Sequence, residues 1–493
     1  MRIPENKQRH FGQIPISKIE IDLQSRYDIP AVLYGLQHIH NNINVRTKIL
    51  DILKEECTTE SSRKKGRLGM ALWNVFVLGV LRLTLGIDYD RLTELANKHI
   101  TIRQMLGHSG FLDSGHHYAL QTIKDNVGLL GAATINKIND IAVAAGHEFI
   151  GVQEVSPLRG KADSYVLETN VDFPTDVKLS NDALRNAIRV LVVLVTMFNL
   201  SGWREHKAIV NKLKRLGRRI TTAKRPKPKA DKGKKAKQEK LQKAYCEFIE
   251  YTTKQIAKIE STLTTLPVAD LVTAPMIAEI KMFVDFAKLQ NDQMYRRVVL
   301  DEKIPTNEKI FSVFEEYTEW ISKGKAGVQV EFGVKVCILE DQHGFILHHR
   351  IMHDEADSDI AVDFIKDAQE RFPALRMCSF DKGFHSPGNQ RDLAELLDLT
   401  VLPKKGKRNK SEADRESQEE FVKARFQHSA VESAINALEV HGLDRCPDRG
   451  LERFNNYVAL GVLGRNLHQL GCKIRNQFRK DAEKEKQKLQ RAA

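Results

Sequence analysis

Apolar residues recur at helical spacing through the first third of the chain. In residues 31–57 they appear every three or four positions, which predicts an amphipathic helix built on Leu33, Leu36, Ile39, Ile43, Leu50 and Leu53. The apolar stretch 68–85 contains Asn74 and Arg82 and predicts a buried helix, because a membrane span needs roughly 20 apolar residues. The shorter apolar stretch 189–200 is also expected to be a core helix.

Three shorter helices are predicted next. Asp88 precedes a periodic segment as an N-cap, and further helical segments follow at 100–106 and 118–129. Two short helices followed by a third are compatible with a helix-turn-helix, although ordinary helical packing explains the same pattern. Residues 1–150 are therefore expected to form an N-terminal, all-helical domain.

The pattern changes near residue 163. Residues 163–173 are rich in β-branched and aromatic side chains and predict a strand that ends at the turn or helix-cap signal 174–176. Helical patterning then returns over about 180–300. It includes a largely apolar helix at 184–200 and a long amphipathic helix at 245–266.

Strands and helices alternate in the last third of the chain. Strands are predicted at 309–314, 328–339, 345–352, 375–380 and 400–403, and helices at 360–371, 390–397 and 419–438. The sequence Asp-Gln-His-Gly at 341–344 predicts a hairpin turn. A strand, a long helical insertion, a hairpin and then alternating helices and strands indicate an α/β fold with a mixed sheet.

The charge of the chain points to a polyanionic partner. The formal net charge is +13, and fifteen of the residues from Lys212 to Lys243 are cationic against two acids. Pro226 and Pro228 interrupt any helix in the middle of this run. A solvated loop explains such a run equally simply, but contact with a DNA backbone is favoured because many cations close together release counterions from phosphates.

Cysteine usage and the N-terminus indicate a reducing compartment. The six cysteines, none in a CxxC pair, argue against a disulfide framework or a zinc ribbon. The first residues lack an apolar signal core. A cytoplasmic protein without a membrane segment is therefore expected.

Three acidic residues have recognisable local settings. Asp163 is expected at the start of the first strand, Asp381 follows the predicted strand 375–380, and Glu432 lies on the predicted helix 419–438. A residue at the carboxyl end of a strand is where open α/β sheets place ligands. Each acid alone also fits an ordinary role: a surface strand residue, a turn cap and a solvated helix face.

Together the three acids suit one chemistry. Two divalent metal ions about 4 Å apart can activate a water and stabilise the leaving oxygen in phosphodiester cleavage. Magnesium prefers oxygen ligands and keeps several waters, so a few carboxylates suffice to hold it. Three converging carboxylates would repel one another without metal.

The motifs around these acids resemble those of bacterial insertion-sequence transposases with a DDE active site, and most closely the ISNCY type. The resemblance rests on residues 163–176 (Asp-Ser-Tyr-Val-Leu-Glu-Thr-Asn-Val-Asp-Phe-Pro-Thr-Asp), on 380–386 (Phe-Asp-Lys-Gly-Phe-His-Ser) and on 428–432 (His-Ser-Ala-Val-Glu). Segments 320–327 and 437–445 add to it, and it covers about 160–180 and 305–470 well.

The resemblance implies an RNase H-like catalytic core with Asp163, Asp381 and Glu432 as metal ligands. It divides the chain into an N-terminal helical domain for DNA binding or dimerisation, a catalytic core in two parts, a helical basic insertion and a basic tail: 1–150, 151–180 with 305–472, 181–304, and 473–493. Related enzymes often carry Tyr, Arg and Lys around the glutamate, where this chain has Arg425, His428 and Glu439. Glu439 is therefore assigned no DNA contact.

The predicted function is transposition of DNA. The protein would bind element terminal repeats, cleave them with two Mg²⁺ ions or with Mn²⁺ as a substitute, and transfer the 3′ hydroxyl ends to target DNA. Supports around the first aspartate are expected in Glu168, Asn170 and Asp176. DNA contacts are expected from Lys382, Lys404, Lys405, Lys407, Arg408, Lys410, Arg425, His428, Arg218, Arg219, Lys224, Arg225 and Lys227.

Partners and alternatives complete the prediction. Both element ends must be joined together, so a homodimer or higher homo-oligomer associated with the nucleoid is expected. Two other classes stay open: a metal-dependent nuclease on the same fold, and a sequence-specific DNA-binding protein without catalytic activity.

Overall fold

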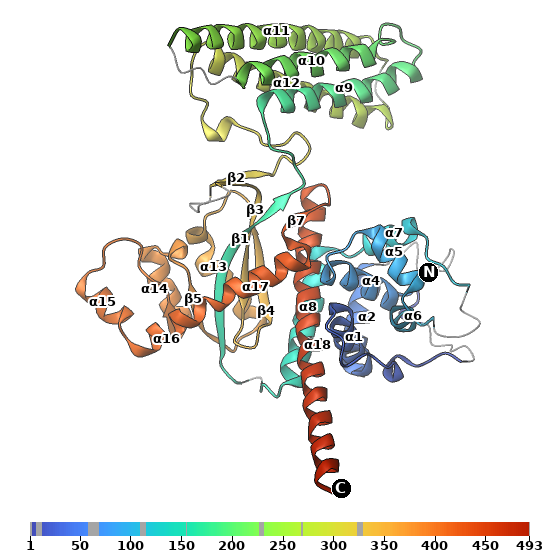
Figure 1. Ribbon diagram of the computed structural model, residues 1–493, viewed down its shortest axis with the longest axis vertical. Coiled ribbons are helices and arrows are strands. Elements are labelled where there is room, and N and C mark those ends of the chain that lie inside the picture. The colour runs from blue at the N-terminus through green and yellow to red at the C-terminus, as the bar shows by residue number, and fades with distance from the viewer. Residues whose placement is uncertain are drawn as a thin grey trace. The chain divides into compact units, whose positions relative to one another are not determined.

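The computed structural model describes residues 2–5, 12–57, 69–108, 115–153, 155–225, 231–267, 270–322 and 329–492. The chain forms two compact units. The first, here called the core unit, contains Met1–Asn170 and Gly333–Ala493, and the second, the insert unit, contains Val171–Phe332 (Figure 1). The predicted insertion 181–304 lies within the insert unit.

The N-terminal part of the core unit is helical, as the periodicity predicts. Its helices are α1 (Asp28–Asn41), α2 (Ile43–Glu56), α4 (Leu72–Thr84), α5 (Tyr89–Lys98), α6 (Ile100–Met105), α7 (Leu120–Val127) and α8 (Ala132–Phe149). The continuous pattern over 31–57 is broken at Asn42, whose side chain accepts a hydrogen bond from the backbone of Val45 and caps α2. Asp88 caps α5 as predicted.

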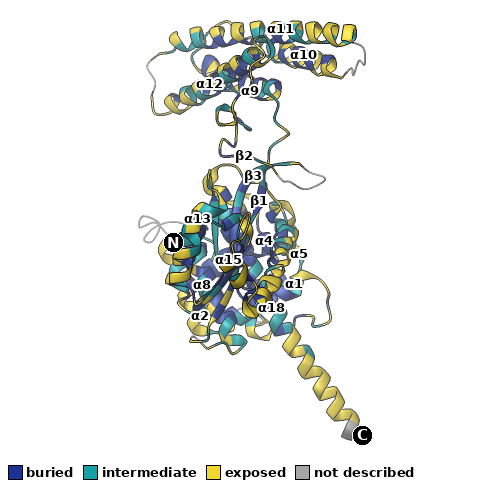
Figure 2. Cartoon of the chain, turned by 90° about the vertical axis from the view of Figure 1, so that its left-hand side faces the viewer, coloured by how far each residue is buried: buried dark blue, intermediate teal, exposed yellow. Residues whose placement is uncertain are grey.

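The C-terminal helix α18 (Leu451–Ala492) is the longest element of the core unit. It packs against α1, α4 and α8. At its crossing with α1 the two backbones touch, because a Cβ on Gly471 would overlap the carbonyl of Ala31 and a Cβ on Gly35 that of Leu467. The predicted tail is not a separate element: its described residues continue α18 and become exposed toward the end (Figure 2).

A mixed sheet forms the centre of the core unit. Its strands are β1 (Leu158–Thr169), β3 (Val330–Glu340), β4 (Ile346–Met352), β5 (Leu375–Phe380), β6 (Leu399–Val401) and the short β7 (Arg445–Cys446). Strand β1 is antiparallel to β3 and parallel to β5; β3 is antiparallel to β4, and β5 is parallel to β6. The mixed sheet and the hairpin joining β3 to β4 confirm the α/β prediction.

Helices after the hairpin flank the sheet: α13 (Asp357–Arg371), α14 (Pro387–Leu396), α15 (Lys410–Glu416), α16 (Glu419–His428) and α17 (Ala430–Leu438). The prediction of one helix over 419–438 is wrong, since a turn at Ser429 separates α16 from α17. A π-helical segment, η5 (Glu439–Leu443), follows α17. Short 3-10 helices occur at Ile16–Lys18, Thr306–Glu308 and Lys382–Phe384.

The insert unit has its own apolar core. Helices α9 (Asp176–Met197), α10 (His206–Lys224), α11 (Asp231–Thr264) and α12 (Thr273–Val298) pack around buried aliphatic residues, and β2 (Glu319–Ser322) follows them. Thr175 caps α9, which confirms the cap signal at 174–176. The predicted strand 309–314 is wrong: its apolar side chain Val313 joins the helical core instead of a sheet.

The last two expectations from the sequence concern disulfide bonds and membrane-spanning helices. All six cysteines are free of disulfides. No helix within the described ranges combines the length and the apolar character needed to cross a membrane.

Candidate metal centre

Asp163 and Asp381 lie side by side on neighbouring parallel strands. The β1–β5 ladder ends with Ala162 opposite Phe380, so the next residue on each strand is an aspartate. Adjacent strands run about 5 Å apart. Asp163 is the sixth residue of β1, not its first as predicted, and the ladder to β3 continues beyond it.

Glu432 reaches the same region from helix α17. This helix packs against β1 through its buried residues Val431, Ala434 and Leu438, while Glu432 in its first turn is exposed. The negative charge of Glu432 acts on the carboxyl group of Asp163. The structure therefore brings the three predicted carboxylates from two strands and a helix to one region of the core unit.

The carboxyl group of Asp163 has a strongly altered affinity for protons. Burial, the largest cause, and the nearby charges of Asp381, Asp357 and Glu432 together raise its pKa from the ordinary value of 3.8 to about 6. The backbone N–H of Ser164 donates to its Oδ1 at 2.8 Å and acts in the opposite direction. Because ionising this group is unfavourable in the free protein, a bound cation is the natural compensation.

Asp357 is a fourth carboxylate that the sequence reasoning missed. It is the first residue of α13, accepts a hydrogen bond from Ser164 Oγ at 2.6 Å and pairs with Lys335 Nζ at 3.3 Å. Successive residues of a strand point to opposite faces, so Ser164 and Asp357 lie on the face of β1 opposite to Asp163. From sequence, Asp357 looks only like an acid at a helix N-terminus.

His428 is held in place close to the carboxylates. Its Nδ1 lies 3.0 Å from Ser379 Oγ on β5, and the ring is half-buried. Burial lowers its pKa, while the charges of Asp381 and Glu432 act in the opposite direction. The predicted DNA contact at His428 is thus a side chain that also ties α16 to the strand preceding Asp381.

The predicted DNA-binding residues after β6 divide into two groups. Lys404 pairs with Glu412 at 2.6 Å, and Arg408 and Arg425 lie 3.1 and 3.8 Å from the buried carboxylate of Glu416. Arg408 and Arg425 are exposed as well, but Lys382, Lys405, Lys407 and Lys410 are exposed and have no ion pair in the described part of the chain. The first group stabilises the loop and α15, and the second group is accessible to a ligand.

The predicted basic residues of the insert unit lie on α10 and α11. Arg218 and Arg219 line a shallow groove between these helices with Arg215, Lys240 and Lys243. Lys224 Nζ lies 5.3 Å from the centre of the Tyr245 ring. Arg225 directly follows α10 and is exposed, and Lys227 lies outside the described residues.

The expected supports of Asp163 have separate positions. Glu168, at the end of β1, pairs in register with Gly333 and Arg445. Asn170 is exposed directly after the strand. Asp176 belongs to the insert unit, where it pairs with Arg297 and accepts a hydrogen bond from the Tyr245 hydroxyl.

The donor set suits hard divalent cations. All the predicted ligands are carboxylates, which Mg²⁺ prefers. The ligand atoms of Asp163, Asp381 and Glu432 do not all lie within 4.8 Å of one another. The three carboxylates therefore do not form a preformed site for a single ion with ligands at about 2 Å.

Comparisons of the chain with protein-family models, with curated proteins and with solved structures find no match.

Proposed function

We propose that this protein is a DNA transposase in which Asp163, Asp381 and Glu432 hold two Mg²⁺ ions on an RNase H-like core. The observation that carries the proposal is the pair of aspartates at equivalent positions of neighbouring parallel strands, with Glu432 acting electrostatically on Asp163. A central strand with an antiparallel pair on one side and a parallel pair on the other is the arrangement expected of an RNase H-like core, and it supports this assignment.

The residues of the centre have distinct tasks. Asp163 and Asp381 directly follow the last paired residues of the β1–β5 ladder. The two paired strands therefore hold the backbone of both ligands in a fixed relative position. Glu432 is exposed and completes the set from the helix. When bound, the two ions would activate a water for cleavage and later the 3′ hydroxyl of the cleaved DNA end, and they would stabilise the leaving oxygen.

Neighbouring groups orient the ligands and the DNA. His428 anchors the end of β5 through Ser379, and this strand leads directly into Asp381. Lys382 is exposed beside Asp381 and is suited to bind a phosphate oxygen of the scissile strand.

DNA binding is proposed to rest on two basic surfaces. One is the groove of Arg215, Arg218, Arg219, Lys240 and Lys243 in the insert unit, and the other consists of Lys405, Lys407 and Lys410 in the core unit. Clustered cations bind the DNA backbone by releasing its counterions. Since two element ends must be joined, we also propose a homo-oligomer that acts on the nucleoid.

The test is a strand-transfer assay with Mg²⁺ or Mn²⁺. Labelled DNA from the sequences that flank the coding region serves as donor, and supercoiled plasmid serves as target. Asp381→Asn and Glu432→Gln should lower the rate by about a thousandfold, since loss of a metal ligand removes several kcal/mol of transition-state stabilisation. Asp363→Asn, an exposed carboxylate of α13, is the matched control and should retain activity.

Each outcome assigns the protein to one class. Joined donor–target products that depend on Asp381 and Glu432 support the transposase. Cleavage without joined products would indicate a nuclease, and binding without cleavage under either metal would indicate a DNA-binding protein. Full activity in both variants would overturn the assignment of the metal ligands.

A further inference from the structure

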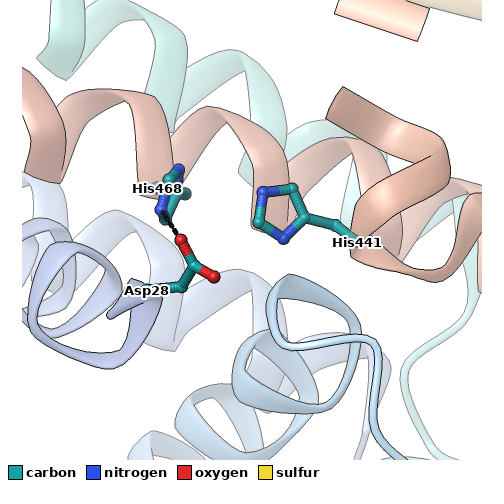
Figure 3. A group of neighbouring side chains, drawn as sticks. All are labelled: Asp28, His441 and His468. Atoms are coloured by element: carbon teal, nitrogen blue, oxygen red, sulfur yellow. Dashed lines mark hydrogen bonds and ion pairs between the residues drawn. The ribbon is translucent and has the colours of Figure 1, made fainter. Parts of the chain in front are cut away.

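A second group of metal-ligating side chains lies on other elements of the core unit. Asp28 is the first residue of α1, His441 lies in the π-helical segment η5, and His468 is on α18. One ligand atom from each lies within 4.8 Å of the others (Figure 3). His468 Nε2 is 3.2 Å from Asp28 Oδ1, and the two imidazole rings have centroids 5.0 Å apart.

The backbone around His441 holds its ring in this position. Gly442 has a φ of +95°, which a glycine adopts without strain, and it interrupts the helical backbone directly after His441. The carbonyl of Gly442 accepts a hydrogen bond from the Tyr457 hydroxyl at 2.9 Å. His441 is 8% exposed, so its ring is fixed by packing before any ligand binds.

A fourth potential ligand lies one helical turn beyond His468. Cys472 Sγ is 3.8 and 4.0 Å from the two ring nitrogens of His468. The side chain of Asp28 is 55% exposed, whereas that of His468 is 11% exposed. This arrangement offers an ion a way in and a largely buried site.

We propose that Asp28, His441 and His468 form a structural site for a divalent transition metal ion, of which Zn²⁺ is the best match, with Cys472 as a fourth ligand. Imidazole and thiolate are ligands of Zn²⁺ and not of Mg²⁺. Ligand atoms about 2.0 to 2.3 Å from a tetrahedral ion lie roughly 3.3 to 3.8 Å apart, which is within the spread of Asp28, His441 and His468. Cys472 is close to His468 but lies outside the group of atoms within 4.8 Å of one another, so its side chain would have to turn to reach the ion. The site is separate from the carboxylate centre in both position and chemistry.

The position of the site indicates what a bound ion would do. It would join α18 and the segment that immediately follows α17 to α1, and Asp28 on α1 is more than 400 residues from both histidines in the chain. Because α17 carries Glu432, the ion would fix the C-terminal end of the helix that supplies a ligand of the proposed active site. The positive charges of Arg465 and Arg475 lie near the site and would repel a bound cation. The binding free energy from the ligands must therefore exceed this electrostatic repulsion.

The full-length protein, freed of metal by a chelator and exchanged into metal-free buffer, provides the test. Zn²⁺ is then added back. We expect one equivalent of Zn²⁺ per chain to stay bound through gel filtration in the presence of excess Mg²⁺, and we expect the added Zn²⁺ to raise the melting temperature of the protein. Replacing Zn²⁺ by Co²⁺ should give the visible absorption of a tetrahedral site. A thiolate-to-cobalt band that disappears in Cys472→Ser would identify the fourth ligand.

Variants separate this site from an ordinary ion pair. His441→Gln, His468→Gln and Asp28→Asn should each weaken Zn²⁺ binding by about a hundredfold, since loss of even an outer-sphere partner weakens metal binding by 10- to 100-fold. His117→Gln, an exposed histidine of the same unit, and Asp381→Asn should leave Zn²⁺ binding unchanged. Circular dichroism shows whether each variant is folded.

Two results would overturn the proposal. If wild-type protein retains no Zn²⁺ and gives no tetrahedral Co²⁺ spectrum, the group is an ordinary ion pair between Asp28 and His468 and not a metal site. Folded His441→Gln that binds Zn²⁺ as tightly as wild type would place the ion elsewhere. Neither result depends on DNA cleavage, so the transposase assignment stands or fails independently.

Discussion

The properties of Asp163 in the carboxylate centre follow first from its burial and then from repulsion by neighbouring negative charges. Asp163 is half-buried and feels the negative charges of Asp381, Asp357 and Glu432, and no cation of the protein is paired with it in the described residues. Its raised pKa records this imbalance. A residue kept in such a position without metal destabilises the folded state, which makes the centre testable by stability alone.

Asp163→Asn should stabilise the metal-free protein in a pH-dependent way. The carboxyl group titrates at about pH 6 when folded and near 3.8 in its ordinary state, so its charge destabilises the fold above pH 6 and has no effect below about pH 4. We expect the free energy of unfolding of the variant to exceed that of wild type by about 1–3 kcal/mol at pH 8 and to equal it at pH 4.

Urea unfolding in chelator at pH 4, 6 and 8 measures this difference. Added Mg²⁺ should then raise the stability of wild type at pH 8 but not that of the variant. A variant that is less stable than wild type at pH 8 without metal would show that Asp163 is satisfied by the protein itself.

Residues of the centre differ in how far the sequence reveals them. Asp163, Asp381 and Glu432 could be predicted because each lies in a recognisable motif. Asp357 could not, because its role depends on a hydrogen bond to Ser164, 193 positions away in the chain. The ion pairs of Lys404 with Glu412 and of Arg408 with Glu416 could not be predicted either. A run of basic residues in a sequence does not show which of them form ion pairs and which are exposed to solvent alone.

Elements were predicted most reliably where local signals agree. The buried strand 375–380 and the capped helices α5 and α9 depend on short-range patterning and were found. The interruptions at Asn42 and Ser429 were missed, because the apolar spacing continues across both turns. The segment 309–314 was misread as a strand because its apolar side chains pack on helices of the insert unit.

The crossing of α1 and α18 gives a prediction at this scale. Gly35→Ala and Gly471→Ala would each push a methyl group into the backbone of the other helix, and a backbone cannot yield as a side chain does. We expect each variant to lose about 1–3 kcal/mol of stability, the usual range for overpacking. Thermal and urea unfolding measure this loss.

Gly388→Ala is the matched control. It lies within α14, and a Cβ there would meet only Ser386 Oγ at an ordinary distance of 3.7 Å. This variant should be neutral or slightly stabilising, because alanine favours a helix. If Gly471→Ala is as stable as the control, the close helix crossing described here is wrong.

At the scale of the whole molecule, basic charge is distributed over both units. The proposed DNA-binding groove of the insert unit contributes five cations, whereas the end of α18 carries a comparable exposed set. Composition alone cannot distinguish a surface that binds DNA from one that is only solvated. The grouping of these cations in one groove is the reason for proposing that surface, and a binding experiment must supply the distinction.

Removing four groove cations should change the salt dependence of DNA binding. In the variant with Arg215, Arg218, Lys240 and Lys243 replaced by glutamine, the slope of log K against log salt should fall by about 3 to 4, since each lost phosphate contact contributes roughly 0.9. Fluorescence anisotropy with duplex DNA at several salt concentrations measures this slope.

The control removes the same charge elsewhere. Replacement of Lys480, Lys484, Lys486 and Lys488, exposed on the end of α18, should change the slope much less. Equal effects of the two variants would mean that DNA responds to total charge and that the groove is not a binding surface.

The most direct test of the central claim is an anomalous difference map from crystals of the protein grown with Mn²⁺ in chelator-treated buffer. The account predicts two manganese peaks about 4 Å apart, one or both bridging Asp163 and Asp381, and one within about 2.1 Å of a carboxylate oxygen of Glu432. An anomalous map without manganese peaks at these residues would contradict the account. A crystal structure in which Glu432 points away from both aspartates would also contradict it.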